Sequence, residues 1–209
     1  MSVTLPVSIG EAIDKFTILD IKLNKITDSR CNDILKEYNT LKPVLDPYVK
    51  KCGYLYDQMK HVNLLIWDMM DVLRDGSLSG EEYSNLCREC IEYNDIRFRV
   101  KKRINHKCNS NLREQKSYKI LSVLLVLGNR PVTDHVKRAI TVMMLINDHV
   151  TVQTTLGELG DLEDFEDLEV VSQCPKRKYK CTYVLVNEDI DIVDTLGIRR
   201  EINRILPNV

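Results

Sequence analysis

The chain has 209 residues, a hydrophobic fraction of 44%, a charged fraction of 29% and a formal net charge of −1. These values are typical of a globular protein with one large domain or two small ones. The near-neutral charge argues against a protein built around nucleic acid, which usually has a strong basic surplus. No apolar run approaches the roughly 18–20 residues that cross a bilayer, so we predict no membrane span.

The first predicted helix covers residues 8–26, SIGEAIDKFTILDIKLNKI. Ser8 followed by Glu11 forms a capping box at its start. The apolar residues are spaced alternately by three and four, at Ile9, Ala12, Phe16, Leu19, Leu23 and Ile26. This regular spacing predicts one apolar stripe of a helical bundle. Nothing before the helix has the basic and apolar regions of a signal peptide, and we predict none.

The second predicted helix begins at Asp28 or Ser29, both of which are good N-terminal caps. Pro43 and Pro47 are expected to interrupt it. Proline lacks the backbone N–H that the helix needs, and it disfavours helical geometry in the residue before it.

The third helix is predicted over about residues 48–73, and a turn over residues 74–80 follows it. Ser79 and Glu82 form another capping box, which opens a fourth helix that ends near Asn105. Both helices continue the alternation of threes and fours. Asn63 occupies an apolar position of this repeat, where a polar residue is expected to fix the helix register rather than to bind a ligand.

A 3.5-residue repeat over several turns favours long helices packed as in coiled coils, and short turns make neighbouring helices antiparallel. We therefore predict an antiparallel, coiled-coil-like bundle over residues 1–110. Its expected buried residues include Phe16, Leu19, Met59, Ile66, Leu86 and Cys90. An apolar stripe of this kind is called a seam below. Helices with such seams often complete their core with a second copy of the chain, so we also predict a homodimer.

The pattern changes after about residue 110. Residues 119–127, KILSVLLVL, predict a buried strand, and Thr133 is expected to cap a helix that ends near Ile146. Residues 149–155, HVTVQTT, alternate as a strand does. Together these segments predict a βαβ unit with parallel strands.

Further elements are predicted as a short strand at residues 170–171, a strand at 179–186 and a final helix at about 189–206. They complete a small α/β domain over residues 118–209. The predicted fold class is therefore α+β in two parts, with a helical bundle followed by an α/β domain.

The richest polar segment is residues 94–107, NDIRFRVKKRINHK. A basic strip on a helix can hold phosphate groups through charge-assisted hydrogen bonds. The candidate anion-binding or phosphosugar-binding residues are Asn94, Arg97, Lys101, Arg103 and Asn105. The simpler interpretation is that most of these residues form a solvated face. Arg97 differs because the repeat places it inside the seam, where a charge needs a partner such as Asp14, Asp20 or Asp68.

The sequence contains no complete catalytic or cofactor motif. Cys87, Cys90, His106 and Cys108 have metal-ligand side chains. However, one helix at about 1.5 Å per residue separates the two halves of this set by more than about 20 Å, so no metal site is predicted. Residues 128–131, GNRP, follow a strand but match no Gly-rich phosphate motif, and a tight turn is favoured over a nucleotide site. No cofactor is predicted.

Four blocks of the first half also carry a resemblance. They read PVSIGEAIDKFTILDIKLNKI, VNLLIWDMMDVLR, YNDIRFRVKKRIN and EQKSY. In this order, over residues 6–118, they resemble an uncharacterised bacterial family of short helical proteins labelled as a domain of unknown function. Its members are often encoded beside, or fused to, glycosyltransferases and tetratricopeptide modules. The resemblance implies no activity, but it singles out Gly10, Asp14, Lys15, Asn63, Trp67, Asn94, Asp95, Arg97, Lys101, Asn105, Glu114, Lys116, Ser117 and Tyr118.

The residues after this match are similar to the opening βαβ unit of glycosyltransferases that use nucleotide sugars. Such a segment is too small for a complete transferase, and the likeness is one of fold.

Two hypotheses for function follow. The favoured one is a non-enzymatic interaction or assembly protein that assists surface-glycan synthesis, with a second copy or another protein as its partner. The alternative is a glycosyltransferase or transferase accessory that binds a phosphorylated sugar or nucleotide sugar through the basic strip. Nucleic-acid binding is a weaker third, since few aromatic residues accompany the strip. The seven cysteines fall largely in helical patterns and suggest free thiols in the reducing cytoplasm.

Overall fold

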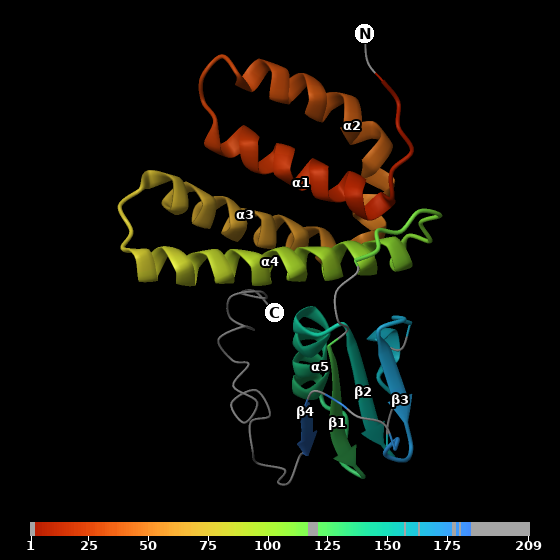
Figure 1. Cartoon of the computed structure of the whole chain (residues 1–209). Coiled ribbons are helices and arrows are strands. Elements are labelled where there is room, and N and C mark those ends of the chain that lie inside the picture. The colour runs from red at the N-terminus through yellow and green to blue at the C-terminus, as the bar shows by residue number, and fades with distance from the viewer. Residues whose placement is uncertain are drawn as a thin grey trace. The chain divides into compact units, whose positions relative to one another are not determined.

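The computed structural model describes residues 3–116, 121–156, 158–162, 164–176, 179 and 181–184. It divides into two compact units, Met1–Gln115 and Lys116–Val209. The first unit is helical and the second contains a parallel sheet, so the fold class is α+β with a helical N-terminal part (Figure 1). The final helix predicted at residues 189–206 and the end of the preceding strand lie outside the described residues.

The first helical hairpin consists of α1 (Ile9–Lys25) and α2 (Cys31–Cys52). The side chain of Ser8 caps α1 by accepting a hydrogen bond from the Glu11 N–H at 3.1 Å. The predicted interruption at Pro43 and Pro47 is wrong, because α2 runs through both residues. Both prolines lie on the exposed side of the helix, so water can solvate the carbonyl groups that lose a partner there.

The second hairpin consists of α3 (Tyr54–Asp75) and α4 (Gly80–Lys107). The predicted capping box at the start of α4 is confirmed, since Ser79 and Glu82 each bond to the backbone N–H of the other. The turn between the helices contains Gly76 at φ +73°, a left-handed conformation that glycine adopts without a steric penalty. Figure 1 shows α3 and α4 running side by side along most of their length.

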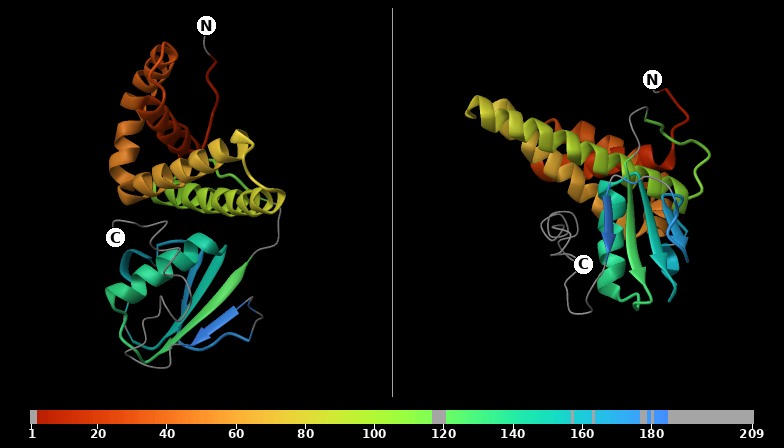
Figure 2. Two further views of the ribbon diagram at one scale, coloured as in Figure 1. Left: turned by 90° about the vertical axis from the view of Figure 1, so that its left-hand side faces the viewer. Right: turned by 60° about the horizontal axis from the view of Figure 1, so that its bottom comes forward.

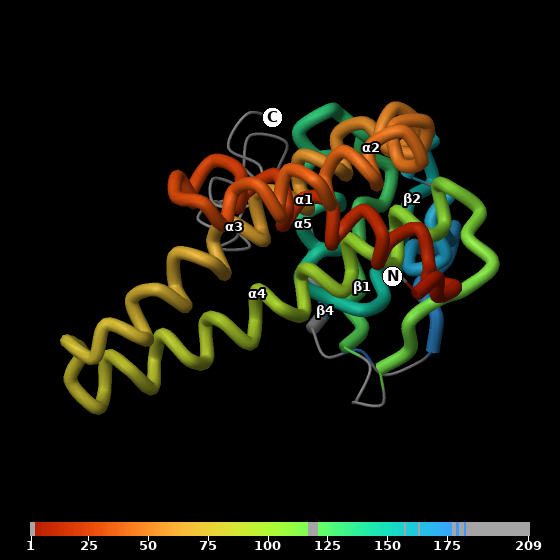
Figure 3. Tube along the Cα trace, turned by 90° about the horizontal axis from the view of Figure 1, so that it is seen from above, coloured from red at the N-terminus to blue at the C-terminus, as the bar shows by residue number. Residues whose placement is uncertain are grey.

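Burial follows the predicted seam in only one part of the helical unit. Phe16, Leu19 and Met59 are buried as predicted. The predicted burial of Ile66, Leu86 and Cys90 is wrong, because these three residues are only half-buried. For Leu86, which lies nearest the turn between α3 and α4, the reason is helix length, since α1 has 17 residues and α4 has 28. At about 1.5 Å per residue, α4 is longer by about 16 Å, and the α3–α4 hairpin extends beyond α1 and α2 (Figures 2 and 3).

The second unit contains a four-stranded sheet in the order β3-β2-β1-β4, and every neighbouring pair is parallel. The predicted βαβ unit is confirmed as β1, α5 and β2. The Thr133 side chain caps α5 by accepting a hydrogen bond from the Val136 N–H at 3.3 Å. The elements are β1 (Ser122–Gly128), α5 (Asp134–Ile146), β2 (His149–Thr154), the 3₁₀ turn η1 (Gly160–Leu162), β3 (Leu168–Val171) and β4 (Cys181–Val184).

Among the described residues, no helix is both long enough and apolar enough to cross a membrane.

Candidate functional site

An ion pair between the partly exposed Arg97 and the buried Asp14 joins α4 to α1. The Arg97 Nε donates to Asp14 Oδ1 at 2.9 Å, and its Nη2 donates to Oδ2 at 2.6 Å. Asp14 is only 3% exposed. Two parallel hydrogen bonds of this kind are the strongest arrangement that a guanidinium and a carboxylate adopt. Asp14 is therefore the partner that the seam position of Arg97 requires, while Asp20 pairs with Lys60 instead.

The pair also determines the protonation of Arg97. Burial on its own lowers the pKa of the guanidinium, but the hydrogen bonds and the negative charge of Asp14 outweigh burial and raise the pKa above its usual value. Arg97 is therefore a permanent cation held against a buried carboxylate.

Asn63 links α3 to the same carboxylate. Its Nδ2 donates to Asp14 Oδ1 at 2.8 Å and to Thr17 Oγ1 at 2.9 Å. The Thr17 hydroxyl in turn donates to the backbone carbonyl of Asp14 at 2.8 Å. These contacts fix the position of α3 along α1, which supports the structural role that the sequence suggests for Asn63.

Lys101 lies one turn after Arg97 on α4 and is held between two carboxylates. Its Nζ is 2.5 Å from Glu11 Oε1 on α1 and 2.5 Å from Glu114 Oε2 in the segment after α4. Burial lowers the pKa of Lys101, but the hydrogen bonds to both carboxylates outweigh burial and raise it above its usual value. The Lys101 side chain is only 11% exposed, so its ammonium group acts mainly as an internal link.

Asn105 holds the start of α1 against α4. Its Oδ1 accepts a hydrogen bond from the Gly10 N–H at 2.6 Å. A Cβ atom at Gly10 would lie 2.6 Å from the backbone oxygen of Lys101. The two helices approach so closely here that only glycine fits without movement.

Gly10→Ala is therefore expected to destabilise the helical unit by about 1–3 kcal/mol, because the added methyl group meets backbone rather than a movable side chain. Gly80→Ala is the matched control, since a Cβ atom at Gly80 meets nothing within 4 Å. Alanine at that helical position is expected to be neutral or slightly stabilising. Urea unfolding followed by circular dichroism measures both changes. Equal stability of the two variants would contradict the close approach.

The five predicted site residues divide into separate groups. Arg97, Lys101 and Asn105 lie together on the face of α4 that contacts α1. Asn94 lies one turn before Arg97 and is exposed. Arg103 comes six residues after Arg97, so the two residues are separated by about 120° around the helix. Arg103 is therefore not on the same face as Arg97.

Sequence analysis did not identify Glu11 and Thr17 as members of this network. A usable signal was present for Glu11, because Glu11 and Asp14 are three residues apart and therefore share one face of α1. The remaining carboxylate, Glu114, lies in a segment without periodicity, and only the family resemblance singled it out.

The buried cysteines of the helical unit show no feature of a nucleophile. Burial is the largest cause that raises the pKa of Cys52, to about 11, and burial also raises the pKa of Cys108. Both thiols are therefore protonated near neutral pH and weakly reactive. Within the described part of the chain, no group of three or more potential ligands could hold a metal ion.

Comparison with protein families gives one match. Residues 3–124 match the model of DUF6165, a family of unknown function. The chain belongs to this family. The match covers the helical unit and ends within β1. Comparison with curated proteins and with solved structures gives no match.

The polar network coincides with positions that the family resemblance singles out. Seven of those positions take part in the contacts described above, namely Gly10, Asp14, Asn63, Arg97, Lys101, Asn105 and Glu114. They come from α1, α3, α4 and the segment that follows α4. The network therefore joins every part of the helical unit except α2.

Proposed function

We propose that this protein is a non-enzymatic interaction protein whose helical unit mediates assembly. The observation behind this proposal is the pairing of Arg97 and Lys101 with carboxylates of their own unit. Arg97 and Lys101 each face a carboxylate within ion-pair distance, from among Glu11, Asp14 and Glu114. Carboxylates this close oppose the approach of a phosphate group, so the two cations are better suited to hold helices together than to bind a phosphosugar.

Several further features support an assembly role. The helical unit contains the long helices α3 and α4. We propose that such helices pair in an antiparallel, coiled-coil-like manner, a common way to associate chains, to form a homodimer or a complex with another protein. The resemblance to proteins encoded beside glycosyltransferases supports a role in surface-glycan synthesis. The described cysteines are free thiols, which supports a reducing, cytoplasmic location.

The strand order favours one second candidate, a transferase or transferase accessory that binds a nucleotide sugar. The order β3-β2-β1-β4 equals the first four strands of the dinucleotide-binding fold, in which ligands bind beyond the carboxyl ends of the strands where the order reverses. Here Gly128 ends β1 with a φ of +63°, and a Cβ atom there would meet nothing within 4 Å. In this second candidate function, the nucleotide sugar binds at the loop after β1 and not at the basic strip of α4.

Two measurements on the full chain decide between these functions. Light scattering from about 1 to 100 μM is expected to show a mass greater than one chain. Thermal unfolding with inorganic phosphate or a panel of nucleotide sugars is expected to leave the midpoint unchanged. A ligand at 100 times its Kd stabilises a protein by about 2.7 kcal/mol, which is easily detected. A monomer whose midpoint rises with a nucleotide sugar would contradict the assembly role and support the second candidate.

A further inference from the structure

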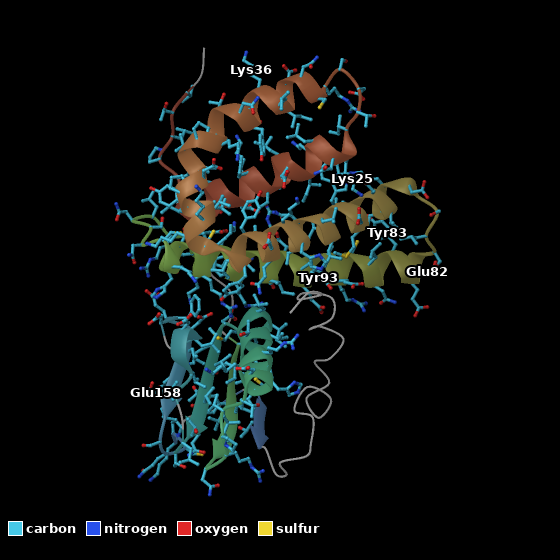
Figure 4. The ribbon with its side chains drawn as sticks, turned by 180° about the vertical axis from the view of Figure 1, so that it is seen from behind. Lys25, Lys36, Glu82, Tyr83, Tyr93 and Glu158 are labelled. Atoms are coloured by element: carbon cyan, nitrogen blue, oxygen red, sulfur yellow. The ribbon has the colours of Figure 1, made fainter. Side chains whose placement is uncertain are left out.

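The α3–α4 hairpin has a proximal part that α1 covers and a distal part that extends further. Asp14 on α1 contacts α4 at Arg97, and Lys25 at the end of α1 bonds to Asp68 on α3 at 2.9 Å. Since α4 begins at Gly80, about 25 Å of this helix precedes Arg97. Figure 3 shows the end of the hairpin near its turn reaching past α1 and α2, and Figure 4 shows Tyr83 near the turn that joins α3 to α4.

The distal part of α4 has one face without any charge. Residues 80–94 include five charged side chains, and at 100° per residue all five fall within an arc of about 120°. A separate arc of about 120° contains only uncharged residues, which we call the tip stripe. Its members are Gly80, Tyr83, Ser84, Cys87, Ile91 and Asn94.

The tip stripe is accessible in the single chain. Ile91 is 64% exposed and Tyr83 is 47% exposed, and Cys87 between them is half-buried. A helix face that stays in water normally carries the charged residues, whereas the centre of a protein interface is depleted in charge. The distribution of charge on α4 is therefore that of a helix with a partner on this face.

The tip stripe continues a face of α4 that already packs against a helix. One turn beyond Asn94, this face presents Arg97, Lys101 and Asn105 to α1. The contact there is close enough to require Gly10. The same face is thus used for helix packing at its proximal end, and the distal end offers small and apolar residues at equivalent positions.

The two large apolar residues of the tip stripe lie at equal distances on either side of its centre. Tyr83 and Ile91 each lie four residues from Cys87. When two copies of α4 pair in an antiparallel direction about a two-fold axis at Cys87, each Tyr83 faces Ile91 of the second copy. Small Cys87 side chains meet at the axis, and no like charges oppose each other. A two-fold contact requires this kind of self-complementary surface.

We propose that the tip stripe is the surface through which two copies of this chain form a dimer, with antiparallel α4 helices crossing at Cys87. This inference rests on the proposed assembly function and specifies both the partner and the surface.

Ile91→Glu tests the surface, and Val44→Glu on α2 is the matched control. Val44 is 63% exposed, close to the 64% of Ile91, so each change replaces an accessible branched apolar residue with a carboxylate. Both variants are expected to keep the unfolding midpoint of the wild type at a concentration low enough for all three proteins to be monomeric. Light scattering is expected to show that Ile91→Glu raises the dimer Kd by about 30-fold or more, as for a central interface residue. Val44→Glu is expected to leave the Kd unchanged.

A cross-linking measurement checks the axis independently. A short bis-maleimide reagent is expected to join Cys87 to Cys87 of the second copy, and Cys87→Ser should abolish this product. Cys174→Ser, which removes an exposed thiol of the second unit, should leave the product intact. A dimer that persists in Ile91→Glu, or dissociates equally in Val44→Glu, would overturn the tip stripe while leaving the assembly function in place. A wild type that stays monomeric up to about 100 μM would overturn both.

Discussion

Arg97→Ala is expected to lower the free energy of unfolding of the helical unit by about 3–5 kcal/mol. The substitution leaves the buried carboxylate of Asp14 without its cation, and an unpaired buried charge is the costly outcome of breaking such a pair. Asn63 still donates one hydrogen bond to Asp14, but an amide does not neutralise the charge. Trp67 lies on α3 and is the single tryptophan of the chain, so urea unfolding followed by its fluorescence reports on the helical unit.

Lys15→Ala is the matched control for Arg97→Ala. Lys15 on α1 pairs with Glu37 on α2, and the two side chains are 60% and 44% exposed. Removal of this surface pair is expected to cost less than about 1 kcal/mol. If Arg97→Ala were equally mild, Asp14 would be well solvated and the cluster would not hold the helices. If the variant were more stable and phosphate stabilised the wild type, Arg97 would instead belong to an anion site.

Local chemistry explains why most helix boundaries could be predicted. Ser79 and Glu82 satisfy each other's backbone N–H groups, and this depends only on residues three apart in the sequence. The error at Pro43 and Pro47 has the opposite origin. A proline breaks a helix only when the freed carbonyl groups have no other partner, and exposure to water depends on the tertiary structure.

The sequence predicted which side of each helix is buried, but not how far along the helix the burial extends. Periodicity identifies which side of a helix is apolar, and Phe16 and Met59 lie on that side and are buried. Leu86 has the same periodicity, but α1 is too short to cover the hairpin along its whole length. The length of a neighbouring helix is not a property of the residue's own pattern.

The contacts of the candidate site were also predictable only in part. A charge at a seam position requires a partner, so the need of Arg97 for a carboxylate was predictable. The pairing of Lys101 with Glu114 was not, because Glu114 reaches Lys101 from a segment without regular structure. The consequence for function was large, since the carboxylates of Glu11, Asp14 and Glu114 pair with the cations of the predicted basic strip.

Leu19→Ala tests whether the α1 seam is the core of the helical unit, and it is expected to cost about 2–4 kcal/mol. Leu19 is 2% exposed, so truncation removes buried methyl groups and leaves a cavity that a packed interior fills only in part. Leu35→Ala on α2 is the matched control, because Leu35 is 46% exposed and its truncation should cost less than about 0.5 kcal/mol. Trp67 fluorescence in urea measures both variants. A loss for Leu19→Ala as small as that for Leu35→Ala would mean that α1 separates readily from the α3–α4 hairpin. The contacts of Asp14 and Lys101 would then be too transient to specify the fold, and the assembly role would lose its structural basis.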